Sequence, residues 1–241
     1  YLKDGGDALF LIENVIVTTR DNPLTEEEKK KNPSFNSIMN DWGINIADDV
    51  VVDLSSHVSG DVGSPATRNY MAHKSIVNDL DYTFFVRPRS ISIKKGRRPT
   101  VRVAPIILTS SDENSWGETN RTLEVKFDEG IDRAGPVPIA FAIWEPKEGT
   151  EASDTRIIVI TDADFLTNAF ISQYSNARLG LNAINWLSES DYQVLIDKKD
   201  VDVKRLDLTS KQKRMVGVML FLMPVIIAVA GMMVWIKHHI S

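Results

Sequence analysis

The sequence predicts an α/β fold with a mostly parallel sheet and flanking helices, plus one C-terminal transmembrane helix. Three observations predict this fold class. Short continuous apolar runs are typical of strands that are covered on both faces. The strongest run precedes a segment with helical spacing of apolar residues, as in a doubly wound β-α unit. Near the C-terminus, residues 215–236 carry no charge, and a helix of that length, about 33 Å, can span a hydrocarbon core of about 30 Å.

The N-terminal region has β-α-β character. Residues 8–12 (ALFLI) form an apolar run that predicts a buried strand. Apolar residues recur at helical spacing over residues 35–42, and Gly43 follows them as a C-terminal cap would. Residues 50–52 (VVV) predict a second buried strand.

The middle of the chain predicts a loop followed by two strands. Residues 54–68 are rich in Ser, Gly and Pro, as loops are. Residues 84–93 and 100–109 predict strands, with the basic sequence KKGRRP at 94–99 between them. Because this cluster has only four charges and no interleaved aromatic residue, a solvated hairpin is favoured over a nucleic-acid patch.

The C-terminal part of the soluble region predicts a second β-α unit. Residues 137–144 and 156–161 predict two neighbouring strands. A helix is predicted at 176–187 because Leu179, Ala183, Ile184 and Leu187 share one helical face. Residues 192–196 predict a last edge strand.

The chain divides into four parts, and since it begins with Tyr1 we interpret it as a segment of a longer polypeptide. The parts are a soluble α/β domain that is the C-terminal part of a larger domain (1–203), a basic juxtamembrane segment (204–214), the transmembrane helix (215–236) and a short tail (237–241). Thr209 and Gln212 have the spacing of a capping box, which predicts that the helix begins near Ser210.

Composition argues against several function classes. The net charge of −5 gives no electrostatic reason to expect nucleic acid as a partner. The chain has no cysteine, so disulfides, thiolate metal sites and cysteine nucleophiles are excluded. Neither a phosphate-binding glycine loop nor a G-x-S-x-G nucleophile elbow occurs. We therefore expect a protein that is not an enzyme and that has neither a cofactor nor a metal.

The best candidate for a binding site is the segment 161–168 (TDADFLTN), because it follows a strong strand. Ligands of open α/β sheets bind at the carboxyl ends of strands. Asp162 and Asp164 could bind a cation or orient a polar ligand, with Asn168 beside them. The alternative is structural: one aspartate caps the next helix and the other holds the turn.

A second polar segment, residues 110–116 (SSDENSW), follows another predicted strand. It could line the same edge of the sheet, where Trp116 would supply an aromatic wall. Alternatively, this segment is an exposed loop whose tryptophan folds back onto the core.

The order of several segments resembles the GldG-type proteins, which are auxiliary components of ABC-type transport systems and are linked in some members to gliding motility. These segments are YLKDGGDALFLIE (1–13), LTSSDENSW (108–116), FDEGIDRAGPVPIAFAI (127–143), ITDADFLTN (160–168), NARLGLNAINWL (176–187) and LDLTSKQKR (206–214) before the terminal membrane helix. The resemblance covers most of the chain and lies in the order of the segments.

The resemblance implies a flavodoxin-like or glutamine-amidotransferase-like domain that membrane helices hold on the extracytoplasmic side of the inner (cytoplasmic) membrane. Its partners would be an ABC permease, an ATPase subunit and the lipid bilayer. The family commonly has an Asp-Ser-Asp-Phe run, and here Ala163 stands where serine is usual, which puts any role of that hydroxyl in doubt. The amidotransferase nucleophile cannot be present, because the chain has no cysteine.

The charges around the span predict the opposite sidedness. Five basic residues precede the span and one lysine follows it: Lys204, Arg205, Lys211, Lys213 and Arg214 before, and Lys237 after. The positive-inside rule would then place the domain in the cytoplasm. We follow the resemblance, since an upstream helix can set the orientation and large domains translocate despite local charge.

Together with the uncharged C-terminal segment, the resemblance implies a membrane-anchored, non-catalytic auxiliary or substrate-recognition subunit of an ABC-type transport system. Two alternatives remain. One is a membrane-tethered hydrolase or carbohydrate-processing domain that uses Asp162 and Asp164 as acid and base. The other is a structural adaptor that binds a fixed protein partner without any small ligand.

Overall fold

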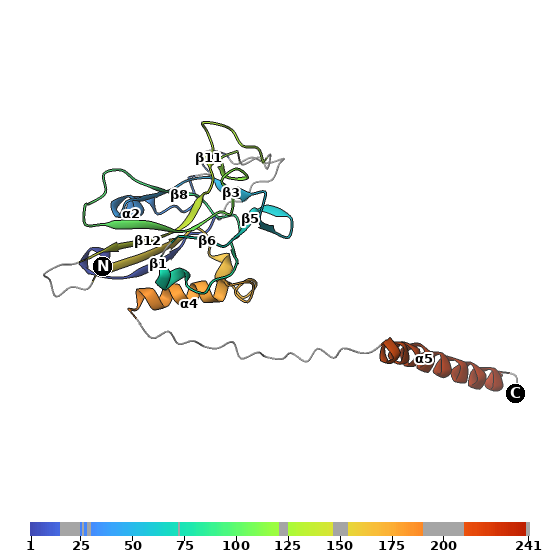
Figure 1. Cartoon of the computed structure of the whole chain (residues 1–241). Helices are drawn as coiled ribbons and strands as arrows, with labels where there is room; N and C mark the ends of the chain where they lie inside the picture. Colours follow the sequence, from blue (N-terminus) through green and yellow to red (C-terminus); the bar gives the residue numbers. More distant parts are fainter. Residues whose placement is uncertain are drawn as a thin grey trace. The chain divides into compact units, whose positions relative to one another are not determined.

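The computed structural model describes residues 1–14, 25, 27, 30–71, 73–120, 125–146, 154–189 and 210–239 (Figure 1). The chain forms two compact units, Tyr1–Gln193 and Val194–Ser241. The edge strand predicted at 192–196, Thr209 of the predicted capping box and most of the predicted juxtamembrane segment lie outside the described residues.

A five-stranded sheet forms the centre of the first unit, in the order β1-β13-β12-β9-β6. Its strands are β1 (Ala8–Leu11), β13 (Thr155–Ile160), β12 (Pro138–Glu145), β9 (Arg102–Leu108) and β6 (Asn69–Tyr70). The strands predicted at 8–12, 100–109, 137–144 and 156–161 are thereby confirmed, with small differences at their ends. The 3-10 helix η1 (Leu2–Asp4) precedes β1.

The strand directions correct the prediction of a mostly parallel sheet. In this sheet only β1 and β13 run parallel, with Ala8 opposite Ile157 and Leu11 opposite Ile160. The other three pairings are antiparallel. The domain is therefore a mixture of helices and several sheets, and its central sheet is not flavodoxin-like.

Each face of the central sheet has its own hydrophobic core, because alternate residues of a strand point to opposite faces. On one face, Ile158 and Ile160 of β13 pack with Leu179 and Ala183 of α4 (Asn176–Leu187). This helix has the predicted bounds. Ile184, however, was predicted on the same face as Leu179 and is 53% exposed, because five residues turn a helix by about 140°. The short helix α3 (Lys74–Val77) contributes Ile76 to the same core.

On the opposite face, Ile157 and Val159 pack with Met39 and Trp42. These two residues come from α2 (Asn36–Met39) and the 3-10 helix η2 (Asn40–Trp42), which together confirm the predicted helical segment. Gly43 ends it with φ 84°, a left-handed conformation that glycine adopts without strain. Figure 1 shows α2 and α4 on opposite sides of the sheet.

Three small sheets surround the central one. They are β11-β10-β3, β2-β8 and β4-β5-β7, in which β2 is Ile44–Ile46, β3 Val50–Asp53, β4 His57–Val58, β5 Asp61–Thr67, β7 Thr83–Phe84, β8 Ile91–Ile93, β10 Ser115–Glu118 and β11 Arg133–Ala134. Because β3 pairs with β10 and β1 pairs with β13, the predicted N-terminal β-α-β unit is wrong.

Two other predictions in the middle of the chain need correction. The region predicted as loop contains β4 and β5, and residues 63–67 of β5 are buried. The strand predicted at 84–93 is divided into β7 and β8. Between these strands Arg87 has φ 48° and precedes Pro88. Proline has no backbone N–H and so cannot donate a hydrogen bond to a neighbouring strand.

The second unit contains the helix α5 (Ser210–His239), which begins at the predicted residue. Its segment Arg214–Lys237 is long and apolar enough to cross a membrane, and none of that segment is buried inside the structure. Pro224 lies inside the helix. The predicted span at 215–236 falls within this segment.

Candidate site at the carboxyl ends of β1 and β13

The parallel pairing of β1 and β13 brings two polar chain segments to one edge of the sheet. Glu13 follows β1, and Asp162 and Asp164 follow β13. The backbone N–H of Ile12 donates to the Ile160 carbonyl at 2.9 Å, so the pairing continues to the residue before Glu13. The site is thus held by the last hydrogen bonds of two strands.

Asp162 is fully buried, and its carboxylate accepts three backbone hydrogen bonds. Oδ1 accepts from the Asp164 N–H at 2.8 Å. Oδ2 accepts from the N–H of Val86 at 3.0 Å and of Phe165 at 3.3 Å. One carboxylate therefore fixes both the turn into the 3-10 helix η3 (Asp164–Leu166) and the segment between β7 and β8.

The residue before Asp162 strengthens the same connection. The Thr161 hydroxyl donates to the Arg89 carbonyl at 2.7 Å, and the Arg89 N–H donates back to Thr161 Oγ1 at 3.1 Å. Arg89 is itself almost fully buried, and its Nε donates to the Ala47 carbonyl at 2.7 Å. Residues 86–89 thus lie across the carboxyl end of β13.

Glu13 completes the cluster from the neighbouring strand. Its Oε2 accepts from the Ala163 N–H at 3.0 Å, so both chain segments are linked directly. Burial raises the pKa of Glu13, and the negative charge of Asp164 acts in the same direction.

Burial also raises the pKa of Asp162, to about 7, against the opposing effect of the hydrogen bonds from Val86 and Asp164. The nearby charges of Glu13 and Asp164 raise it further. A like charge close to a buried carboxylate disfavours its ionised form. The cluster therefore holds a proton more readily near neutral pH than an exposed aspartate would.

Glu13, Asp162 and Asp164 each have one carboxylate oxygen within 4.8 Å of the others. Among the described residues, these three form the group that could coordinate a metal ion, and carboxylate oxygens suit hard cations such as Mg²⁺ and Ca²⁺. As an acid-base pair, however, Asp162 and Asp164 are unequal. Both oxygens of Asp162 already accept backbone hydrogen bonds, so the structural alternative is confirmed for Asp162.

The other two predicted site residues, Trp116 and Asn168, are not part of this carboxylate cluster. Trp116 lies in β10, a strand of another sheet, and is 5% exposed. Its Nε1 donates to Glu118 at 3.0 Å, and its ring packs edge-on against Phe127. The indole is therefore a core side chain, as in the second interpretation of residues 110–116. Asn168 is exposed in the turn between η3 and α4.

Sequence reasoning missed Glu13. The signal was present, because Glu13 directly follows the apolar run at 8–12, just as Asp162 follows the run at 156–161. Two polar residues after two buried parallel strands are expected to meet at one edge. What the sequence did not reveal is that these two strands, far apart in the chain, are neighbours.

Comparisons with known proteins give a likeness of fold. No family model and no curated protein matches the sequence. The chain is similar to a solved structure of the mmIFT52 N-terminal domain, with a TM-score of 0.51 and 14% sequence identity. The match covers 80% of this chain and 70% of that chain. Because one fold can host unrelated functions, a likeness at this identity concerns the fold alone.

Proposed function

We propose that this protein is a membrane-anchored, non-catalytic auxiliary or substrate-recognition subunit of an ABC-type transport system, in some settings linked to gliding motility. In this proposal α5 spans the inner (cytoplasmic) membrane and the folded domain works on the extracytoplasmic side. An ABC permease and its ATPase subunit are the protein partners.

The observation that carries the proposal is the combination of a folded domain with α5. Between Arg214 and Lys237, every residue whose burial the structure describes is exposed except the partly buried Gly217. Residues 215–236 carry no charge. A helix with apolar residues on all sides and no protein around it is stable in lipid rather than in water. The domain is thereby tied to a bilayer surface.

The family resemblance supplies the transport part of the proposal. The segments that carry it include TDADF at the candidate site and NARLGLNAINWL, which forms α4. A non-catalytic role is supported by the use of Asp162 as an acceptor of three backbone N–H groups. In this proposal the exposed turn after η3, which contains Asn168, offers a surface for a partner or cargo.

Affinity capture of the full chain from detergent-solubilised membranes tests the proposal. We expect permease and ATPase subunits in stoichiometric amounts with the protein. The matched control is the same chain with Val225→Arg, which impairs the span while leaving the folded domain unchanged. Repeated recovery of the wild-type chain alone, in good yield, would contradict the proposal. Protease digestion of intact and of lysed cells then reports the side on which the domain lies.

A further inference from the structure

The outer side of α4 is unusually apolar for a helix that faces solvent. Its inner side is buried in the core through Leu179, Gly180 and Ala183. On the outer side, Leu181 is 39% exposed and Ile184 is 53% exposed. A helix at the surface of a soluble domain normally carries polar or charged residues on that side.

The apolar residues continue into the turn before the helix. Ile171 is 37% exposed and Tyr174 is 55% exposed, and the Ala177 N–H donates to the Ile171 carbonyl at 3.1 Å. Ala177, Leu181 and Ile184 have the spacing i, i+4, i+7, so they form one stripe along the helix. We call this surface the α4 outer face; it consists of Ile171, Tyr174, Ala177, Leu181 and Ile184.

The charges of α4 also differ from those of a solvated helix. Arg178 is the single charged residue among the twelve of α4, and the helix contains no acidic residue that a lipid headgroup would repel. The guanidinium of Arg178 donates to the Asp79 carbonyl at 3.0 Å and lies beside the stripe. The apolar stripe can therefore enter a membrane interface as the apolar face of an interfacial helix does, with no carboxylate of α4 to oppose it.

The short connection between the domain and α5 indicates what covers the α4 outer face. Residues 190–209 alone connect the end of the described domain with Ser210, the first residue of α5. Even fully extended, that stretch reaches only about 70 Å, so a bilayer that holds α5 is always within reach of the domain. Tethering converts a weak surface contact into an intramolecular one with a high effective concentration.

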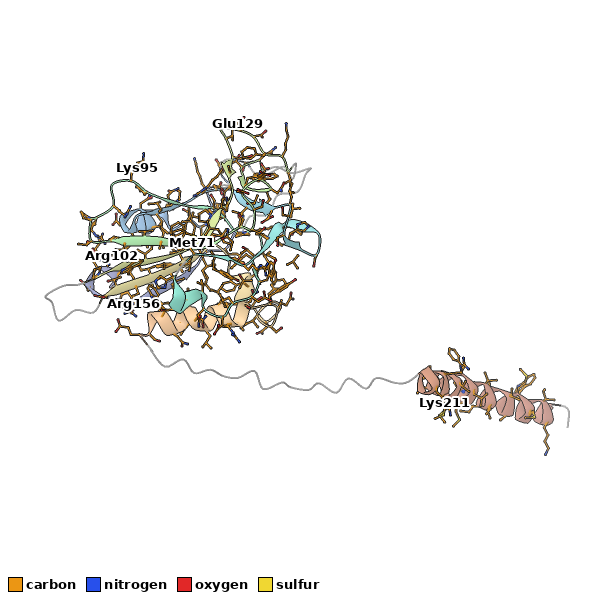
Figure 2. The ribbon with its side chains drawn as sticks, in the orientation of Figure 1. Met71, Lys95, Arg102, Glu129, Arg156 and Lys211 are labelled. Atoms are coloured by element: carbon orange, nitrogen blue, oxygen red, sulfur yellow. The ribbon has the colours of Figure 1, made fainter. Side chains whose placement is uncertain are left out.

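We infer that the α4 outer face docks on the surface of the bilayer that α5 spans, with Leu181 and Ile184 in the headgroup region. This inference rests on the membrane anchoring in the proposed function and adds the surface by which the domain meets the lipid. It predicts that the opposite side of the central sheet, which contains Lys95 (Figure 2), faces away from the membrane.

The absence of cysteine from the sequence makes a site-specific test direct. Ile184→Cys and, as a matched control, Lys95→Cys would each be introduced into the full chain and labelled with an environment-sensitive fluorophore. Both positions are exposed, so neither substitution should disturb the fold. The labelled proteins would be reconstituted into phosphatidylcholine vesicles with and without spin-labelled phosphatidylcholine.

The fluorescence emission of the probe at position 184 should shift to shorter wavelength in vesicles. The spin label should quench that probe at least about twofold more than the probe at position 95, as for a residue at the acyl boundary. Adding Leu181→Glu should remove most of that difference. Equal quenching at both positions would overturn the inference. An emission blue shift of the probe at position 184 in detergent that grows with protein concentration would also overturn the inference, because a second copy of the chain would then cover the α4 outer face.

Extraction of the same vesicles with alkaline carbonate separates this inference from the proposed function. If the protein stays with the lipid while the probe at position 184 remains accessible to water, the docking is wrong and the anchoring stands. If carbonate releases the protein, the anchoring itself fails, and the docking fails with it.

Discussion

Arg156 binds Trp186 in two ways at once. Its guanidinium carbon lies 5.6 Å from the centroid of the indole ring, and its Nη1 donates to the Trp186 carbonyl at 2.8 Å. Its Nη2 also lies 2.9 Å from a carboxylate oxygen of Glu189. The start of β13 thus holds the last turn of α4, where helix carbonyls lack intrahelical donors and a cation is favourable.

We predict that Arg156→Ala lowers the free energy of unfolding of the domain by about 1.5–3 kcal/mol, the usual range for a hydrogen bond to a charged group. Arg156→Lys should recover part of this loss, because lysine keeps the charge without the planar group that stacks on the indole. Denaturant unfolding measures both variants. Arg102→Ala, at an exposed position of β9, should change stability by less than about 0.5 kcal/mol, and an equal loss there would contradict this explanation.

The raised pKa of Asp162 predicts a pH dependence of stability. Since its pKa rises from 3.8 in the unfolded chain to about 7 in the folded one, the folded state binds more protons between these values. The contribution of this group is therefore fully present below about pH 4 and is lost as pH rises through about 7, amounting to a few kcal/mol.

The measurement is denaturant unfolding across this pH range for the wild-type chain and for Asp162→Asn. The difference between the two free energies should change most between about pH 4 and pH 7. Glu13→Gln removes one of the charges that raise the pKa of Asp162, so it should move the transition to lower pH. If the three proteins gave parallel curves, Asp162 would not titrate in this range.

Gly135 lies where a side chain has no room. A Cβ atom added there would come within 2.5 Å of the Ser111 carbonyl oxygen and 2.6 Å of the Ser115 carbonyl oxygen. Backbone atoms cannot move aside as the end of a side chain can. Gly135→Ala should therefore destabilise the domain by about 1–3 kcal/mol, the usual result of overpacking, as measured by thermal unfolding.

Gly180→Ala is the informative comparison, since the Cβ there would meet the end of the Leu166 side chain at 2.5 Å. That side chain can adjust, and alanine is the better helix former by about 1 kcal/mol. We expect the effect of Gly180→Ala to be clearly smaller than that of Gly135→Ala. The opposite order would show that Leu166 is more tightly held than the backbone near Ser111.

Arginine at the centre of α5 tests the span. Val225→Arg should make membrane insertion less favourable by about 2.5–3.5 kcal/mol, so that carbonate extracts a larger fraction of the protein. Val216→Arg lies near the end of the apolar segment, where a long basic side chain reaches the interface. Its effect on extraction should be small. Equal extraction of both variants and of the wild type would exclude a transmembrane α5.

Apolar runs and helical spacing correctly predicted those strands and helices that carry large apolar side chains of their own. Residues 137–144 and 156–161 are continuous apolar runs, and each became a strand of the central sheet. Residues 176–187 were recognised from the spacing of Leu179 and Ala183, which are the residues that pack on the sheet. Gly43 marked a helix end, because few other residues adopt its backbone conformation.

The pairing of strands could not be predicted, because it depends on contacts between residues far apart in the sequence. Residues 50–52 resemble a central strand by composition, yet they pair with residues 116–118 in a small sheet. Residues 63–67 (GSPAT) are small and lack a run of large apolar side chains. They are nevertheless buried, and their two hydroxyl groups donate hydrogen bonds, from Ser64 to Asp61 at 3.0 Å and from Thr67 to the Leu108 carbonyl at 2.7 Å. Periodicity gives no signal for burial of that kind.

The same limit applies to the candidate site. Asp162 and Asp164 were predicted from their position after a strand, and the structure places both in one cluster. Trp116 was placed at the site because it also follows a predicted strand, whereas β10 belongs to another sheet. Glu13 was missed since its neighbour, β13, is encoded near the other end of the domain.

The pairing of β1 with β13 also sets an order of events during synthesis. Ala8 leaves the ribosome roughly 150 residues before its partner Ile157, and at about 5–20 residues per second this interval lasts about 7–30 s. During that time the apolar first strand has no native neighbour. The central sheet can close only when nearly all of the domain has been translated, so a nascent chain that stalls before β13 exposes an unpaired, uncharged edge.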